Sequence, residues 1–112
     1  MNKPIDWRGT ALDDLKAFPD HARKQAGREL RLVQRGLVPT DWKPFERLGP
    51  GGRELRISCA DGWFRIMYVA KLEEAIYVLH CFQKQGRKTS KIDIEIAATR
   101  YRAVIKERGT RK

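Results

Sequence analysis

The sequence predicts an α+β fold, with an N-terminal strand and a helical hairpin packed on a small antiparallel sheet of about four strands, followed by a C-terminal helix. Three observations lead to this prediction. Apolar residues recur first at helical spacing, then alternate with polar residues over short segments, and then return to helical spacing. The first change of period falls within residues 38–52, a predicted loop rich in proline and glycine. The 112 residues contain no internal repeat, so we expect one domain, residues 1–112.

The first half of the chain is predicted to form one strand and two helices. Residues 3–7 alternate weakly in polarity and indicate a short edge strand. Thr10 and Asp13 have the spacing of a capping box at the start of the first helix. Pro19 interrupts that helix because proline lacks an amide donor, and Asp20 is expected to cap the second helix. The second helix has an apolar stripe formed by Ala22, Ala26, Leu30, Val33 and Leu37.

Three strands are predicted in the second half of the chain, at residues 54–60, 63–70 and 75–83. The first two alternate between apolar and polar residues, and Asp61-Gly62 between them is typical of a hairpin turn. The third is almost entirely apolar, as expected of a central strand. Together they predict an antiparallel meander.

A C-terminal helix is predicted from the pair Ser90 and Asp93, which has capping spacing, to about Arg108. Its apolar face consists of Ile94, Ala97, Ala98, Tyr101, Val104 and Ile105. We expect all the helices to pack on one face of the sheet. The opposite face would then be open for function.

The basic charge is the strongest compositional indication of function. The chain has 24 Lys and Arg against 14 Asp and Glu, a formal net charge of +10. Residues 1–51 carry 10 basic and 7 acidic side chains, whereas residues 52–112 carry 14 and 7. Such an excess favours polyanionic partners such as nucleic acid or the ribosome, and the second half is expected to bind them. The alternative is a solvated basic surface without a partner.

Several classes of protein are excluded by composition. No apolar run approaches the length of a membrane span, and the N-terminus lacks the apolar core of a secretory signal, so we expect a cytoplasmic protein without membrane contact. Cys59 and Cys81 lie in apolar segments and are expected to be free thiols. The two histidines, His21 and His80, form no zinc-site spacing with them, and we expect no metal or cofactor.

A candidate anion site is predicted on the first hairpin. Arg56 and Arg65 both alternate with core-type residues, and pairing across the turn would bring them together on the open face. Two facing guanidinium groups repel each other unless an anion lies between them. The alternative is that each arginine pairs with a surface carboxylate or with Glu54. The basic segment of residues 84–91, which begins with Lys84, favours the anion site.

No familiar catalytic motif is present, so any reaction must be one that cationic side chains can perform. RNA cleavage by its own 2′-hydroxyl is such a reaction, because the enzyme need only orient the substrate, stabilise the phosphorane and move two protons. Arginine suits the phosphorane, and lysine or histidine suits the proton transfers. His80 could serve in this way or be a structural residue of an apolar strand, and the sequence leaves both readings open.

The stretch from residue 53 to residue 102 resembles the RelE/ParE superfamily of type II toxin–antitoxin toxins, most of all its phage-derived, HigB-like branch. The resemblance rests on the segments RELRISCADGWFR, IMYVA and YVLHCFQKQGRKTSKIDIEIAATRYR. It implies a RelE-like fold and a toxin that cuts mRNA on the ribosome. It also implies a cognate antitoxin, which is expected to be a helix-turn-helix protein. The toxin would contact operator DNA only through this antitoxin.

The resemblance also implies roles for residues of this chain. Arg65 matches the arginine that contacts the scissile phosphate, and Arg56 falls where relatives have a basic residue on the preceding strand. Where RelE has a C-terminal tyrosine this sequence reads Ile92-Asp93-Ile94, and Tyr101 is expected to pack in the core. The predicted catalytic residues are Arg65, Arg56, Lys84 and His80, and the predicted RNA- and ribosome-binding residues are Arg53, Arg87, Lys88 and Lys91.

Two other functions are compatible with the same fold. The ParE arm of the superfamily poisons DNA gyrase without acting as an enzyme, but such poisons generally lack the basic cluster of Arg56, Arg65, Lys84 and Lys88. An inactive toxin retained as an antitoxin-binding co-repressor is the second alternative. Fold alone does not decide between them.

Overall fold

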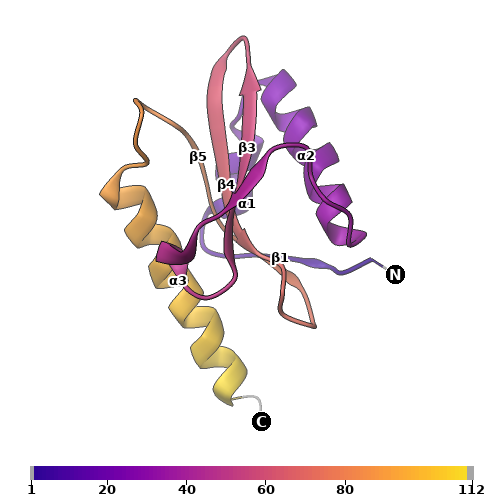
Figure 1. Ribbon diagram of the computed structural model, residues 1–112, viewed down its shortest axis with the longest axis vertical. Coiled ribbons are helices and arrows are strands. Elements are labelled where there is room, and N and C mark those ends of the chain that lie inside the picture. Colours follow the sequence, from indigo (N-terminus) through magenta and orange to yellow (C-terminus); the bar gives the residue numbers. More distant parts are fainter. Residues whose placement is uncertain (1, 111–112) are drawn as a thin grey trace.

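A five-stranded mixed sheet forms the centre of the molecule (Figure 1), and the computed structural model describes residues 2–110. The strand order is β1-β5-β4-β3-β2, in which β1 runs parallel to β5 and the other neighbours are antiparallel. The α+β class and the three-stranded meander are confirmed, whereas the number of strands is five rather than four. The strands are β1 (Ile5–Trp7), β2 (Trp42–Pro44), β3 (Gly52–Cys59), β4 (Gly62–Val69) and β5 (Ile76–Gln83).

The additional strand, β2, lies inside the segment predicted to be a loop. It pairs with β3 at the edge of the sheet, with Trp42 opposite Leu55 and Pro44 opposite Arg53. An edge strand tolerates proline, because one side of it makes no ladder hydrogen bonds. A short 3-10 helix, η1 (Glu46–Leu48), follows before the chain enters β3.

The helical hairpin and the C-terminal helix are present as predicted, in the form of α1 (Ala11–Lys16), α2 (Asp20–Gln34) and α3 (Lys91–Thr110). The capping predictions had mixed outcomes. The Thr10 hydroxyl bonds to Asp14 rather than capping α1, and Pro19 rather than Asp20 occupies the N-cap of α2. At α3 the prediction is confirmed, since the Asp93 amide donates to Ser90 Oγ at 3.1 Å. Within residues 2–110 no helix is both long and apolar enough to cross a membrane.

Helices cover both faces of the sheet, so the prediction that they share one face is wrong. Figure 1 shows α2 and α3 on opposite sides of the strands. One core packs α1 and α2 against alternate residues of β3 and β4, including Leu55, Ile57 and Phe64. The other packs α3 against Met67, Val69 and residues of β5. The almost wholly apolar β5 requires this arrangement, because both of its faces must be buried.

The core beneath α3 does not reach the tip of the β3–β4 hairpin. The turn residues are Ala60 and Asp61, one position earlier than predicted, and Cys59 pairs with Gly62. Near this end, Trp63 is 55% exposed and Ser58 is also exposed. A part of the α3-side face of the sheet is therefore accessible beyond the start of α3.

Candidate active site

Arg56 and Arg65 lie directly opposite each other on β3 and β4, as the hairpin predicted. The neighbouring pairs in the register are Glu54 with Met67 and Ser58 with Trp63. Because alternate residues of a strand share a face, all of these side chains are on the α3 side of the sheet. Arg65 is buried and Arg56 is half-buried, so the pair forms the floor of the accessible region.

Each arginine also has a carboxylate neighbour, which was the alternative interpretation of the pair. Both Arg56 Nε and Arg56 Nη2 lie 3.0 Å from Asp41 Oδ1. Arg65 Nε lies 3.7 Å from Glu54 Oε1, which is an ion pair beyond hydrogen-bond distance. Arg65 Nη1 donates to the Phe64 carbonyl at 3.0 Å, and Arg65 Nε is buried without a hydrogen-bond partner. These contacts restrain each guanidinium group on its own strand of the hairpin.

Glu54 is the buried counter-charge of the cluster. Its side chain is 1% exposed, and its Oε1 lies 3.7 Å from Lys43 Nζ as well as from Arg65 Nε. Thr89 Oγ1 donates to Glu54 Oε2 at 3.4 Å from the loop before α3. A buried carboxylate needs such partners, because an uncompensated buried charge is costly. Glu54 therefore links the β3–β4 hairpin, β2 and the loop between β5 and α3, residues 84–90, which is the basic loop.

Lys84 joins the cluster from the end of β5. Its amide donates to the Trp63 carbonyl at 2.7 Å, which extends the pairing of β5 with β4 by one residue. Burial, followed by the positive charge of Arg65, lowers the pKa of the Lys84 ammonium below 10.5. Burial likewise lowers the pKa of Arg65, and this effect is opposed by Glu54. Lys84 is thus the cluster's candidate for proton transfer.

His80 lies on the same face but is not freely accessible. The residue is 6% exposed, its Nε2 is hydrogen-bonded to Asp93 Oδ1 at 2.7 Å, and its ring stacks on Phe82 with centroids 4.9 Å apart. Its Nδ1 is buried and has no hydrogen-bond partner. Because Asp93 also binds Ser90, this contact fixes the start of α3 against β5.

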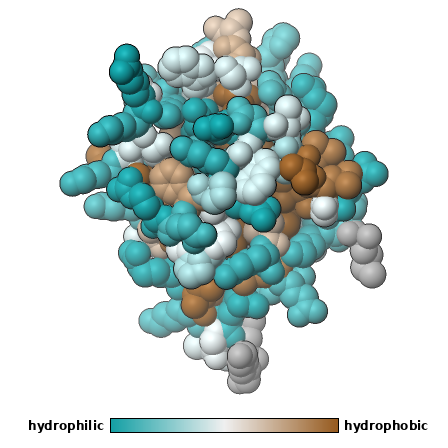
Figure 2. Space-filling model, viewed as in Figure 1, coloured by the Kyte–Doolittle hydropathy of each residue, from teal (hydrophilic) through white to brown (hydrophobic). Residues whose placement is uncertain are grey.

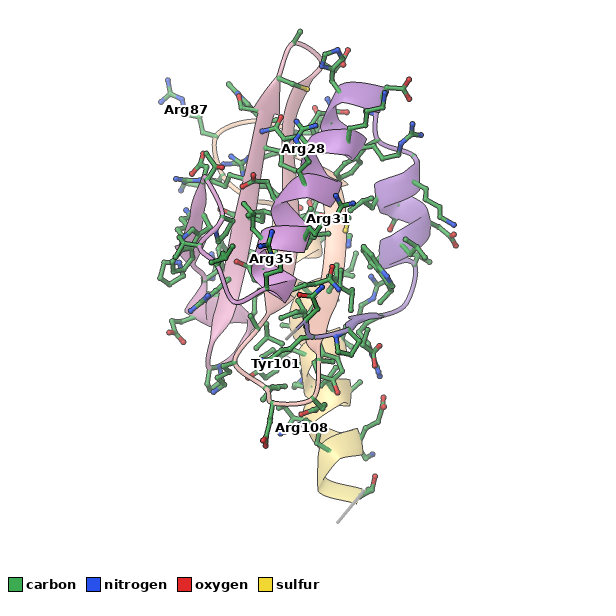
Figure 3. The ribbon with its side chains drawn as sticks, turned by 90° about the vertical axis from the view of Figure 1, so that its right-hand side faces the viewer. Arg28, Arg31, Arg35, Arg87, Tyr101 and Arg108 are labelled. Atoms are coloured by element: carbon green, nitrogen blue, oxygen red, sulfur yellow. The ribbon has the colours of Figure 1, made fainter. Side chains whose placement is uncertain are left out.

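The predicted RNA-binding residues divide between the two faces. Arg87 and Lys88 are exposed in the loop between β5 and α3, and Lys91 is the exposed first residue of α3. Figure 3 shows Arg87 extending away from the body of the molecule. Arg53 lies instead on the α2 side, with its guanidinium 4.5 Å from the centre of the Trp42 ring. The structure therefore separates Arg53 from the cluster.

Sequence reasoning missed two members of this region, Trp63 and Lys43, and it named Glu54 only as a possible ion-pair partner of the arginines. Trp63 is an exposed aromatic side chain beside Lys84, suited to stacking on an unpaired base. Its position on the same alternating face as Arg65 was a usable signal. Lys43 could not be predicted in this way, because it belongs to β2, which lies in the segment predicted to be a loop.

Other residues considered from the sequence are structural. Tyr101 is buried and donates its hydroxyl to the Pro50 carbonyl, which confirms core packing. Cys59 and Cys81 are free thiols as predicted, and burial raises the pKa of Cys81. Within residues 2–110, no group of three or more His, Cys, Asp or Glu side chains is arranged to hold a metal ion.

Comparison with known proteins places the chain in a recognised family. Residues 13–102 match the family described as phage-derived protein Gp49-like (DUF891). The chain belongs to the Gp49-like family. This family is associated with RelE-like toxins and with toxin–antitoxin modules. The matched stretch runs from α1 into α3 and includes Arg56, Arg65 and Lys84. No curated protein matches the chain.

Proposed function

We propose that this Gp49-like protein is the toxin of a type II toxin–antitoxin system and an endoribonuclease that cuts mRNA on the ribosome. The observation that supports this best is the placement of Arg56 opposite Arg65, with Lys84 beside them, on the accessible part of the sheet. A phosphodiester entering this region would meet three cations at once. Membership of a family associated with RelE-like toxins agrees with it.

In the proposed reaction, the substrate's 2′-oxygen attacks the adjacent phosphorus and the bond to the 5′-oxygen breaks. One proton leaves the 2′-hydroxyl and one reaches the 5′-oxygen, giving a cyclic phosphate and a 5′-hydroxyl. Arg65 and Arg56 stabilise the charge that develops on the phosphorane, in a region where burial strengthens the interaction. Glu54 and Asp41 position these guanidinium groups before the substrate arrives.

Lys84 takes part in proton transfer, since a lowered pKa brings its amine closer to the working pH. We assign His80 a positioning role, because its bond to Asp93 holds the basic loop and α3 in place. Arg87, Lys88 and Lys91 bind phosphates of the mRNA or ribosome, and Trp63 stacks on a base of the cut codon. The positive charge that the reaction needs is supplied by side chains.

A cognate antitoxin, expected to be a helix-turn-helix protein, neutralises the toxin in this proposal. Contact with operator DNA would occur through the antitoxin alone. The test is genetic: a short neighbouring gene should encode such a protein, and its co-expression should restore growth to cells that express this chain. If no co-expressed neighbour relieves toxicity, the antitoxin assignment is wrong.

The activity is tested by incubating the purified protein with mRNA, free or on programmed ribosomes. We expect cleavage only on ribosomes, and none when the nucleotide at the cut site carries a 2′-deoxy sugar. Cleavage that survives the 2′-deoxy substitution would exclude the proposed attack. Intact mRNA together with gyrase-linked DNA breaks would identify a gyrase poison, and the absence of either effect would identify a binding module.

A further inference from the structure

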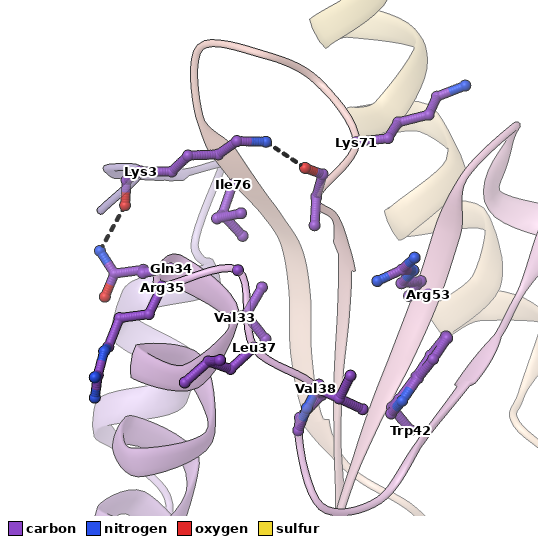
Figure 4. Close-up of a pocket in the computed structure, with 13 residues that line it drawn as sticks. Lys3, Val33, Gln34, Arg35, Leu37, Val38, Trp42, Arg53, Lys71 and Ile76 are labelled. Atoms are coloured by element: carbon purple, nitrogen blue, oxygen red, sulfur yellow. Dashed lines mark hydrogen bonds between the residues drawn. The ribbon is translucent and has the colours of Figure 1, made fainter. Parts of the chain in front are cut away.

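A second group of cations lies on the other side of the sheet. Arg35, Arg53 and Lys71 surround a cavity of about 420 Å³ between the end of α2, the β2–β3 edge and the loop after β4. None of the three has a carboxylate partner among residues 2–110, and no acidic residue lines the cavity. In Figure 4, Arg53 and Trp42 lie across the opening from Val33 and Leu37.

Aliphatic side chains such as Val33, Leu37 and Ile76 line part of the cavity, and apolar side chains that reach solvent lie beside it. Leu37 is 49% exposed, and Val38, the next residue in the chain, is 73% exposed. Figure 2 shows an apolar patch over the end of α2 and the loop that follows it, on a face that is otherwise mostly hydrophilic. Contiguous exposed apolar residues with a charged rim are typical of interaction sites.

A stripe of positive charge leads along α2 toward this cavity. Its members are spaced by three or four residues on the exposed side of the helix, and within the described chain none of them forms an ion pair. Figure 3 shows Arg28, Arg31 and Arg35 following one another along α2. The one glutamate of the helix, Glu29, is buried and accepts hydrogen bonds from Thr40. The basic stripe consists of Lys24, Arg28, Arg31 and Arg35 and extends over about 16 Å.

The chemistry of the surface favours a polypeptide over a nucleic acid. An unpaired base would need a free aromatic face, but Arg53 already covers the Trp42 ring at 4.5 Å. Exposed valine and leucine beside a cavity with aliphatic lining residues suit an aliphatic side chain, and cations without carboxylate partners suit carboxylates. The site lies on the face of the sheet opposite Arg56 and Arg65, so an occupant would leave the candidate active site open.

We propose that this cavity and the basic stripe bind an acidic, amphipathic segment of a partner protein. An aliphatic residue of the segment inserts between α2 and β2, and its carboxylates bind Arg35, Arg53, Lys71 and the stripe. The inference concerns a binding surface and does not depend on ribonuclease activity.

The test uses the full chain and a labelled synthetic peptide of glutamate and leucine. A peptide with every leucine replaced by glutamine controls for charge, and a labelled oligouridine controls for nucleic acid. We expect Arg35→Glu and Val38→Asp each to weaken binding of the glutamate–leucine peptide about tenfold. Lys106→Glu, the same charge reversal on exposed α3, should change it less than about twofold. Both Arg35 and Val38 are exposed, so the variants should melt like the wild type.

Amide shifts in a ¹⁵N spectrum of the complex locate the bound peptide, and they should concentrate in residues 33–42 and at Arg53. Equal affinity for the glutamine control peptide, or no effect of Val38→Asp, would show that charge alone attracts the peptide and would overturn the proposal. Shifts concentrated in residues 84–91 would overturn it as well. If Arg35→Glu weakened oligouridine binding more than peptide binding, the surface would be a nucleic-acid site instead.

Discussion

The two basic regions of the molecule differ in whether their cationic side chains have carboxylate partners. On the α3 side, Arg56 and Arg65 each lie beside a carboxylate, and Glu54 is almost completely buried beneath them. On the α2 side, Arg35 and Lys71 reach solvent, and neither has a carboxylate partner in the described chain. Both regions are rich in cations, but only the first pairs its cations with carboxylates.

This difference has a physical consequence. Positioned guanidinium groups in a partly buried site can stabilise a charge that develops during a reaction, because they need no reorganisation at that moment. Solvated cations without a carboxylate partner contribute mainly to the rate and specificity of association. The comparison therefore supports the two proposals, which place chemistry on the α3 side and docking on the α2 side.

The largest effect is expected from removing the Arg65 guanidinium, which the proposed chemistry needs. Arg65→Ala alone would leave Glu54 with only Lys43 as an ion-pair partner, and we expect a loss of about 3 kcal/mol in stability. The informative comparison is therefore Arg65→Ala/Glu54→Gln against Glu54→Gln. The double variant should melt like its control and cleave mRNA on ribosomes about 10²–10³-fold more slowly. Equal rates would remove Arg65 from the site.

A smaller effect, about 10²-fold in rate, is expected of Lys84→Arg, which keeps the charge but cannot lose its proton in the working range. In the wild type, the pKa of Lys84 below 10.5 should produce a limb of the pH–rate profile below that value. The measurement is single-turnover cleavage across pH, and the limb should be absent from the variant. A limb shared by both proteins would assign the proton transfer to another group.

The basic loop should affect affinity more than rate. Replacing Arg87 and Lys88 with glutamine removes two phosphate contacts, so the slope of log affinity for ribosomes against log salt should become shallower by about 1.5. Arg102→Gln/Lys106→Gln makes the same charge change on exposed positions of α3 and should leave the slope unchanged. Similar slopes for the two double variants would place the polyanion-binding surface elsewhere.

The smallest effect is expected from the ion pair between Glu74 and Arg108, which belongs to neither basic region. Hydrogen bonds from Arg108, and then from Tyr77, lower the pKa of Glu74 from 4.5 to about 2. Because the folded pKa is depressed, this contribution to stability is present above pH 4.5 and is lost as the pH falls toward 2. Urea unfolding of Glu74→Gln should show a slightly lower midpoint at pH 7 and none of this loss on acidification. An unchanged midpoint at pH 7 would mean that the pair contributes nothing.

Local pattern was sufficient to predict the hairpin strands, the helices and the opposition of Arg56 and Arg65, because each depends on alternation or spacing within a short segment. It failed for β2, whose three residues include proline and are strands only because β3 lies beside them. It also failed for the position of α3, although it predicted the helix itself. The apolar residues Met67 and Val69 lie on the face that was expected to be open, and they required a helix over that face.

The candidate site also combines features that local pattern predicts with contacts that it does not predict. Arg53 and Arg56 are three residues apart on one strand, so alternation alone would have placed them on opposite faces, as the structure does. The partners of the two central arginines were harder to predict. Asp41 reaches Arg56 from the segment before β2, and Thr89 reaches Glu54 from a loop 35 residues away in sequence. Such contacts depend on the completed fold.

The separation of chemistry from docking is tested most directly by measuring two activities on the same two proteins. Ribosome-dependent cleavage and binding of the glutamate–leucine peptide would be determined for Arg65→Ala/Glu54→Gln and for Arg35→Glu/Val38→Asp. The account predicts that the first variant loses cleavage and keeps peptide affinity, and that the second keeps cleavage and loses peptide affinity. If both folded variants lost both activities to the same degree, the two regions would act as one surface and the account would be contradicted.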